Sequence, residues 1–171
     1  MLRLGPWGYV TQPVARRRDN VVQVRVEVVD EGRTRELRRA VLRPNLPPGA
    51  RLPGDQLSTG VHLAAVEDDG AVLGTCYVYP DPCPWQPERD GAWHLRQMAT
   101  ADGHRGRGIG GAVVEAAVEY VTEQGAPLLW CHAREPAVAF YRAHGFRTHG
   151  GIFTDERHVI PHQQMWRELS A

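Results

Sequence analysis

Hydrophobic and polar residues alternate strictly over residues 22–28, the first patterned stretch of the chain. Period-two alternation of this kind predicts a strand with one buried face. Residues 109–124 instead repeat with a helical period, because apolar residues form one stripe and glutamates lie on the opposite face. Gly125 and Pro127 are expected to end this helix. Two periods in one chain predict a fold built from both strands and helices.

Apolar runs bounded by glycine, proline or aspartate predict the remaining strands. These strands are expected at residues 62–67, 71–79, 93–100 and 128–133, with two more after residue 146, the last at 163–169. Further helices are predicted at 34–43 and 135–144. In the first of these, Leu37, Ala40 and Val41 are expected to face inward and the arginines outward. Three loops rich in proline or glycine, 44–60, 80–91 and 150–162, connect the elements.

Strands alternate with helices in the second half of the chain, which predicts a mixed sheet with helices on both faces. A length of 171 residues is ample for one domain with a sizeable core. We therefore expect residues 21–171 to form one domain. Residues 1–20 include three consecutive arginines but no periodicity, and an extended N-terminal arm is expected there.

The composition narrows the possible partners and the cellular compartment. Twenty basic and twenty acidic residues cancel, so no nucleic acid and no membrane surface is expected as a partner. Three widely spaced cysteines argue against a disulfide framework and suit a reducing cytoplasm. No stretch has the length of a signal peptide core or a membrane span. A cytoplasmic protein is therefore expected.

A glycine-rich turn, Arg105-Gly106-Arg107-Gly108-Ile109-Gly110-Gly111, joins a predicted strand to the strongest predicted helix. Glycines at alternate positions permit positive φ and close approach of another group to the backbone. Free N–H groups at a helix start bind anions, phosphate above all. The two arginines add positive charge. The turn is therefore predicted to bind the pyrophosphate of a cofactor.

Two well-known phosphate loops fit this turn poorly. A nucleoside-triphosphate loop requires Lys and then Ser or Thr after its glycines, whereas Gly111 and Ala112 follow Gly110. The spacing Gly106-x-Gly108-x-x-Gly111 does match the dinucleotide fingerprint. However, the acidic residue expected about 20 positions later is absent near Cys131, and 60 residues after the turn are too few for a doubly wound sheet. Both interpretations are disfavoured.

The residues on both sides of the turn resemble the GNAT superfamily of acyl-CoA-dependent N-acyltransferases. Arg105-x-x-Gly108-x-Gly110 is followed by a helix, a strand and Ala137-x-x-Phe140-Tyr141-x-x-x-Gly145-Phe146, and the match covers residues 95–146. The tail Pro161-His162-Gln163-Gln164-Met165 resembles that of a small bacterial branch. The resemblance implies an α+β, three-layer α/β/α fold. Its mixed sheet would have about seven strands and splay between the fourth and fifth.

The same resemblance implies the chemistry. The cofactor would be acetyl-CoA (coenzyme A), and a primary amine of a small molecule or peptide would attack it directly in a ternary complex. The cofactor-binding residues would be Met98, Ala99 and Thr100 for the pantetheine arm and Arg105, Gly106, Arg107, Gly108, Ile109, Gly110 and Gly111 for the pyrophosphate. Arg134 replaces the asparagine of many family members. It would either reach the cofactor's phosphates or be surface charge.

Tyr141 is the catalytic candidate. Helical spacing alone favours an aromatic ring that packs its helix on the sheet, but the family motif implies that Tyr141 protonates the coenzyme A thiolate. No general base is evident. His94, His132 and His162 are the acceptor-side candidates, although a structural role is the commoner explanation for each of them. A solvated turn accounts best for Asp155 and Glu156.

Other chemistry is less well supported. His144, His149, His158 and His162 have tolerable ligand spacing, but without paired cysteines no metal is expected. Cys131 is expected in the core rather than as a nucleophile. Two classes of function remain, an N-acetyltransferase and a non-catalytic module that binds or senses acyl-CoA, and the turn together with Tyr141 favours the enzyme. The identity of the acceptor, the choice of acyl group and the oligomeric state, with a homodimer as one option, are left open.

Overall fold

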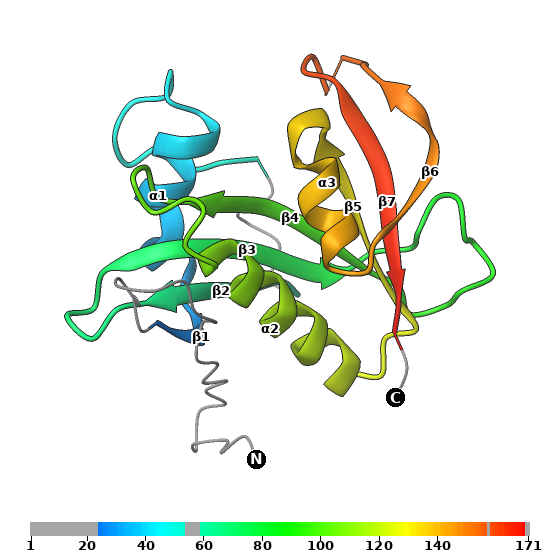
Figure 1. Ribbon diagram of the computed structural model, residues 1–171, viewed down its shortest axis with the longest axis horizontal. Helices are drawn as coiled ribbons and strands as arrows, with labels where there is room; N and C mark the ends of the chain where they lie inside the picture. Colours follow the sequence, from blue (N-terminus) through cyan, green and yellow to red (C-terminus); the bar gives the residue numbers. More distant parts are fainter. Residues whose placement is uncertain (1–23, 54–58, 157, 170–171) are drawn as a thin grey trace. The chain divides into compact units, whose positions relative to one another are not determined.

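The computed structural model describes residues 24–53, 59–156 and 158–169. These residues form three α-helices and seven strands in one sheet of order β1-β2-β3-β4-β5-β7-β6 (Figure 1). The chain divides into two compact units. Unit 1 comprises Met1–Val78 and Gln97–Ala117, and unit 2 comprises Tyr79–Arg96 and Val118–Ala171. The arm expected at residues 1–20 lies outside the described residues, and a single domain over 21–171 stays a prediction.

Unit 1 contains an antiparallel arrangement of β1 (Arg25–Val29), β2 (Val61–Val66) and most of β3 (Val72–Pro80). β2 pairs with β1 on one side and with β3 on the other. The turn between β2 and β3 closes with a 2.9 Å hydrogen bond from Glu67 N to the Ala71 carbonyl, and Gly70 takes φ +90° there. Glycine is suited to that conformation because it has no Cβ. The two strands predicted around this turn are confirmed.

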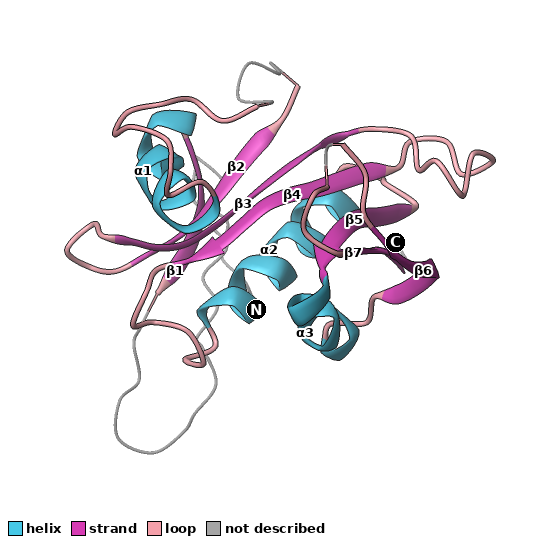
Figure 2. Cartoon of the chain, turned by 90° about the horizontal axis from the view of Figure 1, so that it is seen from above, coloured by secondary structure: helices cyan, strands magenta, loops and turns pink. Residues whose placement is uncertain are grey.

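Two helices cover opposite faces of the strands in unit 1 (Figure 2). α1 (Glu31–Leu42) places Thr34 Oγ1 3.5 Å from Nδ1 of His62 on β2. α2 (Ile109–Glu123) lies on Gly74 of β3, where a Cβ would come within 2.7 Å of the Ile109 side chain and 3.6 Å of Ala65. His62 and Ala65 are an odd number of residues apart on one strand, so their side chains point to opposite faces. Helix layers therefore lie on both sides of these strands.

The inner face of α1 differs from the prediction. Thr34 and Arg38 are fully buried, whereas Leu37 is half-buried and Ala40 is exposed. The buried guanidinium is neutralised inside the fold, because Arg38 Nη2 lies 2.7 Å from Glu31 Oε1 and Nε donates to Thr34 Oγ1 at 2.9 Å. A periodicity argument assigns charged residues to solvent. It misses an arginine whose charge and hydrogen bonds are satisfied by partners in the core.

Unit 2 is built on four strands. The first part of β4 (Trp93–Thr100) runs parallel to β5 (Leu128–Arg134), and their ladder consists of the pairs Trp93–Leu129 and His94–Trp130. β7 (His162–Glu168) pairs antiparallel with β5 along its whole length and with β6 (Arg147–Phe153) on its other side (Figure 1). The short parallel ladder is the splay between the fourth and fifth strands. The mixed seven-stranded sheet confirms the predicted fold class.

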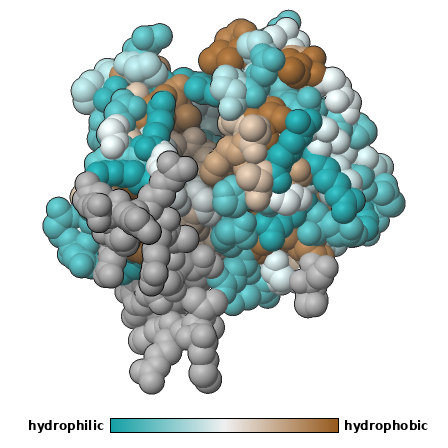
Figure 3. Space-filling view, viewed as in Figure 1, coloured by the Kyte–Doolittle hydropathy of each residue, from teal (hydrophilic) through white to brown (hydrophobic). Residues whose placement is uncertain are grey.

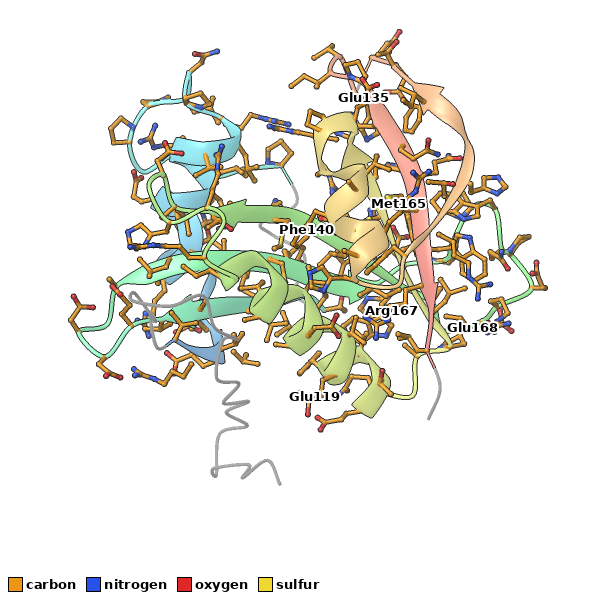
Figure 4. The ribbon with its side chains drawn as sticks, in the orientation of Figure 1. Glu119, Glu135, Phe140, Met165, Arg167 and Glu168 are labelled. Carbon is orange, nitrogen blue, oxygen red and sulfur yellow. The ribbon has the colours of Figure 1, made fainter. Side chains whose placement is uncertain are left out.

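The helix after β5 is shorter than predicted. A 3₁₀ turn, Glu135–Ala137, precedes α3 (Val138–Ala143) and replaces the first turn of the predicted α-helix. Gly145 ends it with φ +78°. Arg167 of β7 reaches this end, and its Nη1 donates to the His144 carbonyl at 2.8 Å (Figure 4). α3 is thereby tied to the strand that carries the C-terminal motif.

The apolar stripe predicted for α2 is confirmed, since Val113, Ala117 and Val121 are all fully buried.

A few apolar side chains elsewhere in the described residues are exposed. Figure 3 shows hydrophobic (brown) surface over the end of the β6–β7 hairpin, where Val159 is 79% exposed. Among the described residues, no helix combines the length and hydropathy needed to cross a bilayer.

Candidate active site

The glycine-rich turn lies in unit 1 and leads directly into α2. Gly106 and Gly108 take φ +75° and +83°, which L-residues with a side chain rarely adopt. A Cβ at Gly106 would meet no atom within 4 Å, so the backbone conformation, and not lack of space, requires glycine there. Gly110 lies inside α2 and is not among the residues with positive φ. Two of the three alternate glycines therefore adopt the positive φ that their spacing permits.

The turn presents donors suited to an anion. The first helical hydrogen bond of α2 runs from Ala112 N to the Gly108 carbonyl at 3.0 Å, so the N–H groups of the three preceding residues are not used in the helix. Arg105 is mostly exposed and lies 3.3 Å from Asp102. The Ile109 side chain is buried in the core, which leaves only its main chain for a ligand. Backbone N–H groups and guanidinium groups fit the pyrophosphate of an acyl-CoA.

A kink in β4 immediately precedes the residues implied for the pantetheine arm. Gln97 has φ +53° and is the one residue other than glycine with positive φ in the described ranges. Its side chain holds the kink, since Oε1 accepts from Arg38 Nη1 at 2.7 Å and Nε2 donates to the Pro53 carbonyl at 3.1 Å. Backbone strain of this kind often marks a functional segment. Local sequence gave no signal for it, because glutamine does not favour this conformation.

The three residues that follow the kink continue β4. Ala99 is buried, while Met98 and Thr100 are half-buried. The strand then leaves the sheet through Ala101, whose N–H donates to the Leu73 carbonyl at 2.8 Å. The two segments implied for the cofactor, residues 98–100 and 105–111, therefore both lie in unit 1. Their contacts with a cofactor stay a prediction.

Tyr141 lies in unit 2 on α3 and is buried, with 6% of its surface exposed. Its ring contacts Phe140 and Phe146, with centroid separations of 5.2 and 5.3 Å. The Tyr141 carbonyl accepts a 3.1 Å hydrogen bond from Phe146 N after the helix ends. The ring thus makes the packing contacts that helical spacing predicts. Its role in proton transfer stays a prediction.

His94 is buried on β4 among polar and aromatic groups. Its Nδ1 lies 3.1 Å from Asp81 Oδ2 and 3.0 Å from Tyr79 Oη, and its ring stacks on Trp130 with centroids 3.5 Å apart. Burial lowers the pKa of His94 to about 4, although the hydrogen bond to Asp81 opposes this shift. His94 is therefore neutral at pH 7. Through these contacts the His94 side chain packs between Asp81, in the loop after β3, and Trp130 on β5.

His132 and His162, the other two acceptor-side candidates, meet around His158. Ring centroids of His132 and His162 each lie 4.7 Å from that of His158. Burial, followed by the positive charges of neighbouring groups, lowers the pKa of His132 to about 4. Burial also lowers the pKa of His162. Asp155 Oδ1 lies 2.8 Å from Nδ1 of His158. Sequence spacing did not reveal this pair, since Asp155 was expected in a solvated turn.

Arg134 is half-buried at the end of β5, opposite His162 in the β5–β7 ladder. Glu135 N, the next residue, donates to the Pro161 carbonyl at 2.9 Å, so the end of β5 is tied to the chain before β7. This position accords both with contact to the phosphates of the cofactor and with a simple surface charge. Cofactor contact by Arg134 stays a prediction.

The three cysteines are free and buried. Cys131 is buried, which confirms its core position. Burial raises the pKa of its thiol and so disfavours the thiolate that a nucleophile requires. Within the described ranges, no group of three or more His, Cys, Asp or Glu side chains is arranged to hold a metal ion.

Comparison with known proteins agrees with this geometry. The model of the Acetyltransferase (GNAT) family matches residues 31–146. The uncharacterised N-acetyltransferase YitI of Bacillus subtilis is 28% identical over 129 residues, which cover 75% of this chain and 85% of YitI. The matched region includes the glycine turn, α2, β5 and Tyr141.

Solved structures show the same fold. FeeM, an N-acyl amino acid synthase from uncultured soil microbes, superposes with a TM-score of 0.68 at 11% identity, covering 84% of this chain and 90% of FeeM. Nourseothricin acetyltransferase superposes with a TM-score of 0.53 at 26% identity, covering 71% of each chain. The assignment to a small branch with a Pro-His-x-x-Met tail stays a prediction. The family match over most of the chain, together with the glycine turn and the parallel splayed strands, establishes that the chain belongs to the GNAT acetyltransferase family and is an acyltransferase.

Proposed function

We propose that the enzyme transfers an acetyl group from acetyl-CoA to the primary amine of a small molecule, by direct attack in a ternary complex. The observation that carries the donor half of the proposal is the turn before α2. Its positive φ angles at Gly106 and Gly108 and its unused N–H groups suit a pyrophosphate. Acyl-CoA supplies the acyl group as an activated thioester.

In this proposal the main chain of unit 1 holds the donor. Residues 105–111 bind the pyrophosphate, and Met98, Ala99 and Thr100 bind the pantetheine arm through backbone groups. A backbone N–H near the thioester would polarise its carbonyl and stabilise negative charge on the oxygen during attack. Arg134 adds positive charge for the phosphates. The kink at Gln97 supports this arrangement, because it leaves β4 with an irregular edge at the point where such contacts begin.

Tyr141 assists the leaving group. As the new C–N bond forms and the C–S bond breaks, the sulfur leaves as a thiolate and takes up a proton. A phenol of pKa about 10 is a weaker acid than a thiol of pKa about 8.5, so a hydrogen bond from the phenol stabilises the thiolate before the proton is transferred. The burial of Tyr141 among aromatic rings favours a fixed position for its hydroxyl group.

Two observations support a small acceptor. Nourseothricin acetyltransferase, at 26% identity, is named for a small-molecule substrate. The proline-rich loop 80–91 is also pinned, because Trp130 Nε1 donates to the Asp81 carbonyl at 2.9 Å and Asp81 N donates to the Ala92 carbonyl at 3.0 Å. A loop fixed in this way suits the wall of a shaped pocket. Free cysteines agree with a cytoplasmic enzyme, and a homodimer is included in the proposal.

Release of free thiol from acetyl-CoA, measured across a broad panel of amines, tests the proposal. We expect release that depends on one class of small amine. Tyr141→Phe should lower turnover at least about tenfold and leave acetyl-CoA binding, measured by calorimetry, unchanged. Tyr120→Phe, which removes a hydroxyl group from α2 outside the proposed site, is the matched control. Tight binding without release for any amine would favour an acyl-CoA sensor instead.

A further inference from the structure

Three side chains of unit 2 form a hydrogen-bonded chain that the roles above do not use. Asp155 Oδ1 lies 2.8 Å from Nδ1 of His158, and Nε2 of His158 lies 3.2 Å from Nδ1 of His132. His132 is on β5, whereas the other two residues lie between β6 and β7. The backbone fixes their geometry, because Asp155 and His158 exchange two N–H···O=C bonds of 3.1 Å. Asp155 Oδ1 also accepts from the His158 N–H at 2.7 Å.

The carboxylate determines where the protons of this chain lie. An ionised aspartate only accepts hydrogen bonds, so His158 donates its Nδ1–H to Asp155. A neutral His158 then has a lone pair on Nε2, which accepts from Nδ1–H of His132. Neutral His132 therefore carries its proton on Nδ1 and a lone pair on Nε2. The far nitrogen of the chain is thereby prepared to accept a proton.

That nitrogen is buried without a partner. Nε2 of His132 makes no hydrogen bond to any residue that the structure describes. Buried polar atoms are nearly always satisfied in folded proteins, so an exception indicates a ligand, a water molecule or a reacting group. Nε1 of Trp85 is a second such atom, and the rings of Trp85 and His132 are 5.9 Å apart. An N–H donor near a lone pair suits an amine, which can both accept and donate.

The other two histidine candidates lack this combination. Nδ1 of His94 lies within hydrogen-bonding distance of both Asp81 and Tyr79, and its ring is stacked on Trp130, so it is held as a packing element. Nδ1 of His162 donates to the Ile160 carbonyl. Within the described part of the chain, His132 is the histidine with a buried nitrogen that has no partner.

We propose that Nε2 of His132 accepts the proton that the acceptor amine loses during acylation, and that His158 and Asp155 are positioning residues for it. This inference rests on the proposed function. The amine nitrogen forms the C–N bond and the C–S bond breaks. The surplus proton on the amine nitrogen moves to His132, and Tyr141 donates a proton to the coenzyme A thiolate. Solvent then restores both residues. The new charge on His132 is stabilised through His158 by the carboxylate of Asp155, as in a Ser-His-Asp triad.

The groups around His132 keep it unprotonated before reaction. His94 and Arg96 on β4, His158 between β6 and β7, and His162 on β7 act on it electrostatically. Asp155 is hydrogen-bonded to His158 on the side away from His132. Burial and the positive charges among these groups lower the pKa of His132 to about 4. The base form is therefore present at pH 7 and is lost only as the pH falls through about 4. Acceptor turnover is expected to show no loss of this base between about pH 6 and 8.

Nitrogen-15 NMR of the histidine rings tests the proton positions in the full chain without cofactor or acceptor. At pH 7 we expect His132 and His158 both to carry their proton on Nδ1. Asp155→Ala removes the acceptor and should shift both rings toward the Nε2–H form. Glu156→Ala, which removes a neighbouring carboxylate outside the hydrogen-bonded chain, should leave them unchanged. A proton on Nε2 of His132 in the unmodified protein, or tautomers unaffected by Asp155→Ala, would overturn the inference.

Thiol release with acetyl-CoA and the amine panel tests the base itself. His132→Phe keeps an aromatic ring and removes both nitrogens, and we expect turnover to fall about 10²- to 10⁴-fold with acetyl-CoA binding unchanged. Asp155→Ala should lower turnover about tenfold or more, as part of the same contribution. His149→Phe is the matched control, because that exposed ring stacks on Trp85 outside the chain.

The outcomes separate this inference from the proposed function. Turnover by the unmodified enzyme that His132→Phe leaves intact overturns the role of His132 alone. Absence of turnover with every amine overturns the proposed function and, with it, the role of the base. Circular dichroism on each variant establishes that lost turnover does not reflect lost folding.

Discussion

In unit 1 the candidate site is made of main chain, with positive φ angles at Gly106 and Gly108 and a helix start whose N–H groups are unused. In unit 2 the candidate residues are side chains, chiefly the rings of His132 and His158. A backbone site needs particular φ angles, so it leaves glycines at fixed spacing in the sequence. A side-chain site depends on which rings meet after folding. The two units therefore differ in how they respond to substitution and to pH.

Loss of the buried guanidinium in unit 1 should have the largest effect. Arg38→Met retains much of the side-chain volume, but it removes the buried guanidinium that donates to Glu31, Thr34 and Gln97. We expect the free energy of unfolding to fall by about 3–5 kcal/mol. Urea unfolding followed by circular dichroism measures this change.

An exposed ion pair in unit 2 supplies the control for that measurement. Arg89→Met removes a 2.9 Å pair with Glu168 in which both side chains are partly exposed. Its cost should be about 0–1 kcal/mol, because solvent screens the pair and the side chains lose entropy in forming it. Similar losses for the two variants would contradict the structural role assigned to Arg38.

Acid should act mainly through unit 2. The pKa of His94 is about 4 in the folded protein and about 6.5 when unfolded, so the unfolded chain binds more protons between these values. Stability therefore falls as the pH falls through this window, and His94 accounts for about 3 kcal/mol at pH 4. His132 adds less, because it is more accessible to solvent.

Urea unfolding at pH 7 and pH 4 tests this effect of acid. Carboxylates also titrate in this range, so the informative quantity is the difference between the unmodified protein and His94→Phe. The variant should lose about 3 kcal/mol less on acidification. Equal losses for both proteins would show that His94 is not the group that makes the folded state sensitive to acid.

A smaller effect is expected in the glycine turn of unit 1. Gly106→Ala should cost about 1–2 kcal/mol of stability, because an L-residue disfavours φ +75°. It should also weaken acetyl-CoA binding measured by calorimetry. Gly32→Ala in α1 is the matched control, since a Cβ there meets nothing within 4 Å and φ is not positive. That change should stabilise the protein by up to about 1 kcal/mol. Equal effects would refute the conformational role.

The smallest expected difference concerns how the two units open. Cys76 lies in unit 1, and Cys83 and Cys131 lie in unit 2. All three thiols are buried with raised pKa values, so a thiol reagent should label them only after local or global opening. Mass spectrometry can follow each cysteine at pH 8. If residues 21–171 form one cooperative domain, the three rates should coincide, whereas faster labelling of Cys76 alone would indicate separate opening of unit 1.

Much of the framework was accessible from sequence because it depends on local pattern. β4 and α2 begin at the predicted residues, since a strand, a glycine turn and an amphipathic stripe follow one another without ambiguity. The start of α3 was less accurate, because the residues predicted as its first turn, Glu135–Ala137, form a 3₁₀ turn. Family motifs located the turn and Tyr141, but local pattern gave no indication of the residues that brace them.

The parts missed are contacts between residues distant in sequence. Periodicity placed Arg38 in solvent, yet Arg38 is buried, and one of its hydrogen-bond partners, Gln97, is 59 residues away. The sequence patterns assigned Asp155 to a solvated turn and His158 to a set of histidines with metal-ligand spacing. In the structure both belong to one series of hydrogen bonds that ends on His132. A hydrogen bond between β5 and the β6–β7 connection depends on sheet order. Single-sequence patterns do not determine that order.

The kink at Gln97 also constrains how this sequence can diverge. A glutamine at φ +53° is held by a hydrogen bond from Arg38 and one to the Pro53 carbonyl. Glycine would adopt the same angle without either bond. Residues 38 and 97 should therefore change together among relatives, and a chain that lacks arginine at 38 is expected to carry glycine at 97. In the laboratory, Gln97→Gly should recover part of the stability that Arg38→Met removes, which would make the pair a measurable case of intragenic suppression.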